Sequence, residues 1–153
     1  MPIAALLLVL TQSAPAPDVL LSRLEGRWHG AGTVLEMPAA VELTWEWTLD
    51  RQFLRLTFAN RMGPRRFEGH AYYRALGKGR YRGMWFDNSG MFRPIEATQD
   101  GDALVAAWGT ADTERGETIY RLLPTGEMEI LDRVLSKTGE WRPFGRVVAK
   151  KAP

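Results

Sequence analysis

The sequence predicts an all-β protein: a single up-and-down antiparallel β-barrel of about ten strands, with a short N-terminal helix. Short segments with strand-like alternation follow one another from Gly26 to Lys150, and a Gly, Pro, Asp or Asn marks a turn after almost every one. Six Trp, six Phe and four Tyr among 153 residues favour half-buried strands. Because no helical segment separates the strands, sequence neighbours are expected to pair and close into a barrel.

The first residues are separate from this domain. Ile3–Leu10 is an apolar run followed by small residues, which predicts a signal peptide over residues 1–16 and a barrel domain over residues 17–153. A run this short cannot span a bilayer, so no transmembrane anchor is expected. The expected location is periplasmic or secreted, and it becomes cytoplasmic if residues 1–16 are not a signal peptide.

Asp18 opens the first element, because its side chain suits the cap of a short helix. An apolar stripe is expected on this helix, made of Val19, Leu20, Leu21 and Leu24, and Gly26 ends it. The strands that follow are expected at Arg27–Met37, Val41–Leu49, Phe53–Asn60, Phe67–Leu76, Tyr81–Asn88, Phe92–Thr98, Ala103–Trp108, Glu117–Leu123, Glu129–Leu135 and Trp141–Lys150.

Alternation predicts which side chains line the barrel, since successive residues of a strand point to opposite faces. It is clearest in Val41–Leu49, where Trp45 and Trp47 share the apolar face. A barrel of this size has room for one small ligand. The candidate ligand-binding residues are aromatic side chains expected inside and two arginines suited to a carboxylate. They are Trp45, Trp47, Phe58, Tyr73, Trp85, Trp108, Arg121 and Arg133.

The helix leading into Gly26-Arg27-Trp28 resembles the start of the lipocalin-like (calycin) barrels. In those proteins a Gly-x-Trp opens the barrel, and a basic residue near the chain end packs on the Trp. The resemblance implies structural roles for Gly26, Trp28 and Arg146, with Arg133 as the second choice for the basic residue.

Leu49–Leu54, Phe67–Tyr73 and Tyr81–Asp87 are similar to segments of an uncharacterised bacterial family related to the nitrobindin-like haem-binding barrels. Those barrels hold haem iron through a histidine late in the chain. The histidines of this sequence, His29 and His70, are both early and are expected on the surface. Haem is therefore disfavoured, and no cofactor is expected.

Composition and motifs exclude several other classes. The sequence has no cysteine, which excludes disulfides and thiolate metal sites, and its two histidines show no metal-ligand spacing. A net charge of +2 gives no general attraction to nucleic acid. No serine stands in a nucleophile motif. Asp87, beside Trp85 and Phe86, is a candidate acid or base. The preferred interpretation is that it lies at a strand end and is satisfied by the backbone or an arginine.

The predicted function is non-catalytic binding of a small hydrophobic or amphipathic ligand inside a barrel of the cell envelope. One alternative is nitrobindin-like haem or nitric-oxide binding. The other is a fully packed barrel with a structural or interaction role. The oligomeric state is left open.

Overall fold

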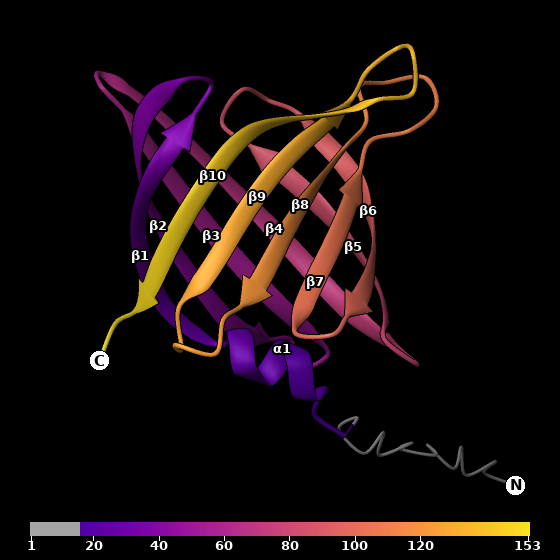
Figure 1. Ribbon diagram of the computed structural model, residues 1–153. Coiled ribbons are helices and arrows are strands. Elements are labelled where there is room, and N and C mark those ends of the chain that lie inside the picture. Colours follow the sequence, from indigo (N-terminus) through magenta and orange to yellow (C-terminus); the bar gives the residue numbers. More distant parts are fainter. Residues whose placement is uncertain (1–15) are drawn as a thin grey trace, which may run out of the picture.

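Ten antiparallel strands form one closed barrel, and a short helix lies across one of its ends (Figure 1). The computed structural model describes residues 16–153, so nearly all of the expected signal peptide lies outside the described residues. The elements are α1 (Val19–Leu24), β1 (Gly26–Val34), β2 (Met37–Thr48), β3 (Phe53–Met62), β4 (Arg65–Gly77), β5 (Arg80–Asp87), β6 (Phe92–Asp100), β7 (Ala103–Trp108), β8 (Gly116–Leu122), β9 (Met128–Leu135) and β10 (Trp141–Lys151).

Each strand pairs with its neighbours in the sequence, and β1 pairs with β10 to complete the ring. This arrangement confirms the predicted up-and-down barrel, and none of the ten described strands has a free edge. Among the described residues, no helix is long and apolar enough to cross a membrane.

One expected strand boundary is wrong. The segment Arg27–Met37 does not run as one strand, because the chain reverses at Leu35 and Glu36 between β1 and β2. Both residues have positive φ, 49° and 63°, as a tight hairpin turn requires. Such a turn normally contains Asn or Gly, so a Leu-Glu pair gives no turn signal in the sequence.

Helix α1 closes the end of the barrel at which β1 begins (Figure 1). Asp18 caps the helix by accepting a hydrogen bond of 2.9 Å from the Leu21 backbone N–H. The same carboxylate accepts a bond of 3.2 Å from the Tyr81 hydroxyl on β5, which ties the helix to the wall. Leu20, Leu21 and Leu24 of the helix are buried against the barrel interior, whereas Val19 is 76% exposed, so its place in the predicted apolar stripe is wrong. The three leucines cover this end of the barrel.

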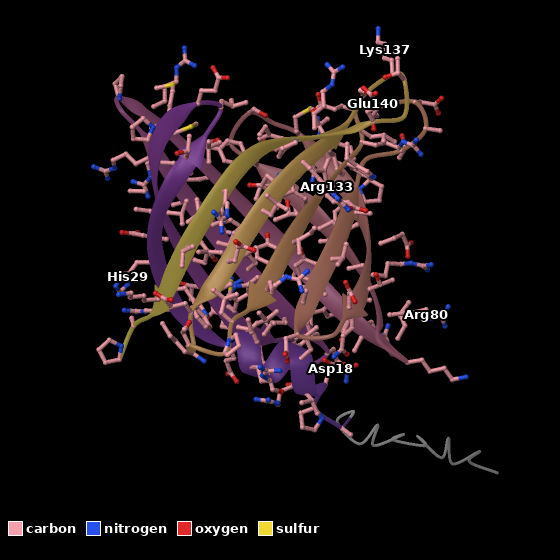
Figure 2. All side chains as sticks on the ribbon, viewed as in Figure 1. Asp18, His29, Arg80, Arg133, Lys137 and Glu140 are labelled. Atoms are coloured by element: carbon pink, nitrogen blue, oxygen red, sulfur yellow. The ribbon has the colours of Figure 1, made fainter. Side chains whose placement is uncertain are left out.

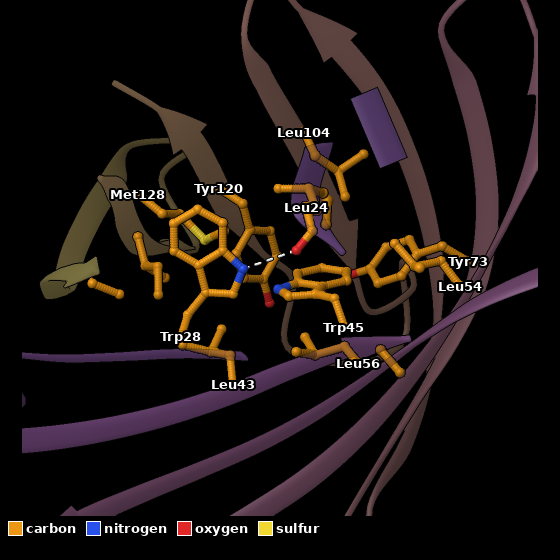
Figure 3. Packing of buried hydrophobic residues seen from close by; sticks show 14 of the residues in the cluster. Leu24, Trp28, Leu43, Trp45, Leu54, Leu56, Tyr73, Leu104, Tyr120 and Met128 are labelled. Carbon is orange, nitrogen blue, oxygen red and sulfur yellow. Dashed lines mark hydrogen bonds between the residues drawn. The ribbon is translucent and has the colours of Figure 1, made fainter. Parts of the chain in front are cut away.

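Trp28 lies at this closed end. Its indole Nε1 donates a hydrogen bond of 2.8 Å to the Leu24 carbonyl oxygen (Figure 3). Lys151 on β10 places its Nζ 5.2 Å from the centre of the Trp28 ring. The expectation that Arg146 fills this place is wrong, because Arg146 points outward and pairs with Glu129 at 2.6 Å.

Side chains pack tightly in the half of the barrel next to α1. Trp45 stands at the centre, with its ring 5.6 Å from Tyr73 and 5.0 Å from Tyr120 (Figure 3). Leu54 and Leu56 on β3 are completely buried around it. This half therefore holds a hydrophobic core that fills the barrel interior next to α1.

Candidate functional site

The end of the barrel opposite α1 differs from the packed end in exposure. Inward side chains near α1 are almost completely buried, whereas near the other end those on β3 to β9 are mostly partly exposed, with Asn60 on β3 buried among them. Water therefore reaches the inner wall from the open end. We call the partly exposed inward side chains of this half the inner mouth. They are Phe58, Phe67, Trp85, Arg93, Trp108, Thr118 and Asp132.

An aromatic wall forms one side of the inner mouth. The rings of Phe58, Phe67 and Trp85 lie 6.1 to 6.3 Å apart, and Phe67 and Trp85 stack with an angle of 18° between their planes. The indole of Trp85 covers Gly69 on the neighbouring strand β4, where any Cβ would collide with it. Gly69 thus lets the indole lie along the wall, and the three rings offer apolar surface to a bound molecule.

The inner surface next to Trp85 carries a row of polar contacts across four successive strands, β6 to β9. Arg93 on β6 places its guanidinium carbon 5.0 Å from the centre of the Trp108 ring on β7. Trp108 Nε1 donates to Thr118 Oγ1 on β8 at 3.3 Å, and this hydroxyl donates to Asp132 Oδ1 on β9 at 2.7 Å. We call these four residues the polar row.

Arg93 is the cation of the polar row. Its side chain is 17% exposed, and its Nε–H is buried without a hydrogen-bond partner. Glu114, in the loop between β7 and β8, lies 3.6 Å from a terminal nitrogen of the guanidinium, which is longer than a good hydrogen bond. Arg93 therefore retains unused donor capacity on an inward side chain.

Asp132 is the acid at the other end of the row. Burial raises the pKa of Asp132 to about 6, and the hydrogen bond from Thr118 acts in the opposite direction. Gly145 on β10 has no side chain to keep this carboxylate away, and a Cβ there would lie 3.0 Å from Asp132 Oδ2. Below the row, burial raises the pKa of the Tyr120 hydroxyl, and the neighbouring Tyr73 and Asp132 raise it further.

Asp87 has a different environment. It accepts hydrogen bonds of 2.9 Å from Trp85 Nε1 and of 2.9 Å from the Ser89 backbone N–H, and a further bond from the Ser89 hydroxyl. Burial alone would raise the pKa of Asp87, but these hydrogen bonds outweigh it and hold the pKa below its ordinary value. The carboxylate is thus a satisfied strand-end group, as the preferred sequence interpretation had it.

The predicted ligand-binding residues fall into three places. Trp45 and Tyr73 are buried in the packed half, and Trp47 lies near its edge, where Arg51 stacks 5.0 Å from the ring centre. The other aromatic candidates belong to the inner mouth; these are Phe58, Trp85 and Trp108. The structure thus brings only part of the predicted set together at the open end.

The expectation of an inward arginine at 121 or 133 is wrong. Arg133 is on the outer wall, where it pairs with Glu117 at 2.5 Å and lies 4.6 Å from the Trp141 ring centre (Figure 2). Arg121 alternates with the buried Tyr120 and shares the outward side. These strands carry apolar residues on both faces, so alternation could not orient them.

Sequence reasoning missed Arg93, although a usable signal was present. In β6, Arg93 alternates with Ile95 and Ala97, which are both buried inside the barrel. A charged residue in phase with an apolar series is a candidate inward charge. That signal was hidden because Pro94 and the exposed Phe92 flank the arginine.

Two grooves lie on the outer wall. One, of about 450 Å³, runs over β10, β1, β2 and β3 to the start of β4 and includes His29, Ala31 and Ala40. The other, of about 330 Å³, runs over β5 to β8. Neither is lined by a residue of the inner mouth.

Haem ligation by histidine does not fit this interior. His29 and His70 are both exposed and alternate with inward residues, so each points away from the barrel, as Figure 2 shows for His29. Across residues 16–153, the structure also places no cluster of His, Asp or Glu in which a metal ion could be held.

Fold and site together define a class of protein, a closed antiparallel barrel that is packed at one end and accessible at the other. No protein-family model and no curated protein matches the sequence. Among solved structures, the chain is similar to Rv2717c from M. tuberculosis, with a TM-score of 0.70 and 17% sequence identity. The match covers 90% of this chain and 100% of that one. At this identity the likeness shows the barrel fold alone.

Proposed function

We propose that the protein binds a small amphipathic carboxylate in the inner mouth, without catalysing a reaction on it. The observation that carries this proposal is Arg93, an inward guanidinium with a buried and unpartnered Nε–H. A buried donor without an acceptor is costly, and a ligand carboxylate would supply two acceptor oxygens in the geometry that arginine prefers.

The apolar body of such a ligand would lie on Phe58, Phe67 and Trp85. These rings remain partly exposed at the mouth, so a bound chain would remove apolar surface from water at about 25 cal/mol per Å². The resemblance to lipocalin-like and nitrobindin-like barrels also supports a ligand in the interior. Since the histidines point outward, we propose a site without haem.

The proposed location is the cell envelope. Its support is the apolar run Ile3–Leu10 and the small residues that follow it, which are typical of a signal peptide.

Decanoic acid titrated calorimetrically into the protein tests the binding function. We expect a Kd near the micromolar range, about −8 kcal/mol. Arg93→Gln should weaken binding by about tenfold to a hundredfold, because a charged hydrogen bond contributes about 1.5–3 kcal/mol. Decanol, which lacks the carboxylate, should bind wild type and variant alike.

Arg121→Gln is the matched control, since Arg121 lies on the outer wall. Equal affinity of decanoic acid for wild type and Arg93→Gln would remove Arg93 from the site. If neither decanoic acid nor decanol bound at all, the packed structural barrel would be the better explanation.

A further inference from the structure

Asp132 lies at the end of the polar row away from Arg93, and its carboxylate faces the interior beside Tyr120. An ionised carboxylate can accept about four hydrogen bonds. Within the described part of the chain, the bond from Thr118 is the one donated to it. The carboxylate therefore reaches the accessible interior with acceptor capacity left over.

An acid in such a position is energetically costly. Burying a carboxylate is unfavourable unless donors or a cation compensate it. The nearest cation of the row is Arg93, which is separated from Asp132 by Trp108 and Thr118 and has Glu114 beside it. Asp132 is thus compensated by a single hydroxyl.

We infer that Asp132 accepts a hydrogen bond from a second polar group of the ligand, a hydroxyl or an ammonium. This inference rests on the proposed carboxylate site at Arg93 and names the ligand class: a bifunctional molecule with an acid at one end and a donor at the other. In such a molecule the segment between the two ends lies along the polar row and contacts the Trp108 ring, which stands between Arg93 and Asp132.

The separation of Arg93 and Asp132 along the inner surface of the barrel sets the length of such a molecule. Three strand intervals separate β6 from β9, and each is about 4.8 Å, so the two backbones lie about 14 Å apart along the wall. Both side chains point inward, which brings the guanidinium and the carboxylate closer together. A medium-length chain such as a ten-carbon acid matches this separation.

Three probes test the inference: decanoic acid, 10-hydroxydecanoic acid and 10-aminodecanoic acid. In the wild-type protein we expect both substituted acids to bind at least fivefold more tightly than decanoic acid. Asp132→Ala should abolish both advantages. Asp132→Asn should abolish the advantage of the amine, because an amide has no charge, and should retain part of that of the hydroxyl, because the amide oxygen still accepts.

Glu129→Gln is the control, because Glu129 pairs with Arg146 on the outer wall. If circular dichroism shows that Asp132→Ala does not fold, the binding of 10-aminodecanoic acid to Asp132→Asn provides the test. Equal binding of all three probes to the wild type would overturn the inference and leave the carboxylate site at Arg93 standing. The inference would also be overturned if 10-hydroxydecanoic and 10-aminodecanoic acid still bound more tightly than decanoic acid to folded Asp132 variants. If no probe bound, the proposed function itself would fail.

Discussion

Replacing Asp132 by asparagine is expected to change the pH dependence of stability. Burial raises the pKa of this carboxyl group from 3.8 to about 6 in the folded protein. Between these two pH values the folded state binds more protons than the unfolded state, so stability falls as the pH rises. At about 1.4 kcal/mol per pKa unit, the loss approaches about 3 kcal/mol at neutral pH. This is an upper bound, because water reaches part of the side chain.

The asparagine side chain of the variant cannot ionise, so the variant lacks this loss. Urea unfolding of both proteins at about pH 4 and about pH 8 measures this loss of stability. The difference in unfolding free energy between variant and wild type cancels the contributions of the titrating groups that the two proteins share. The free energy of unfolding of Asp132→Asn relative to wild type should increase from the lower to the higher pH. Asp112→Asn, in the exposed loop between β7 and β8, should show no such increase. An equal difference at both pH values would refute the burial of Asp132, and a decrease would mean that a partner stabilises the charged form.

Three further predictions concern other parts of the chain. Trp28→Ala should lower the free energy of unfolding by about 3–5 kcal/mol, because Trp28 is 3% exposed. Trp141→Ala, on the outer wall, should change it little, and equal effects of the two substitutions would contradict the packing described at the closed end. Titration of haemin should give no sharp Soret band, and a band that disappears in His70→Ala would show that this histidine reaches the interior. The intact mass of the protein from its native host should lack roughly the first sixteen residues; a full-length cytosolic species would contradict export.

The order of the strands could be predicted because almost every turn carries Gly, Pro, Asp or Asn, and because pairing between sequence neighbours needs no further information. The turn at Leu35 and Glu36 could not, since its positive φ values are held by the hairpin and not by the residue types. Tertiary structure imposes this conformation.

The site was harder to predict than the fold. In β8 and β9, apolar residues such as Ile119 and Leu131 lie on the outward face, so alternation carries no information on orientation there. The basic residue near Trp28 is a different case. Gly145, Val147 and Ala149 form an inward series on β10 that continues to Lys151, so the alternation itself favours Lys151 over Arg146.

The closure of β1 against β10 affects how the chain reaches its native state. Trp28 pairs with Lys151, and the Ala152 N–H donates to the Arg27 carbonyl oxygen at 2.8 Å, so the ring is sealed by residues from opposite ends of the domain. A chain still being synthesised lacks its last strand, and the sheet formed by the earlier strands has two unpaired edges. Such edges promote association with other chains. High contact order also slows folding, to milliseconds or longer for barrels of this kind. The unpaired edges of β1 and β9 are covered only when the eleven-residue strand β10 pairs with both of them.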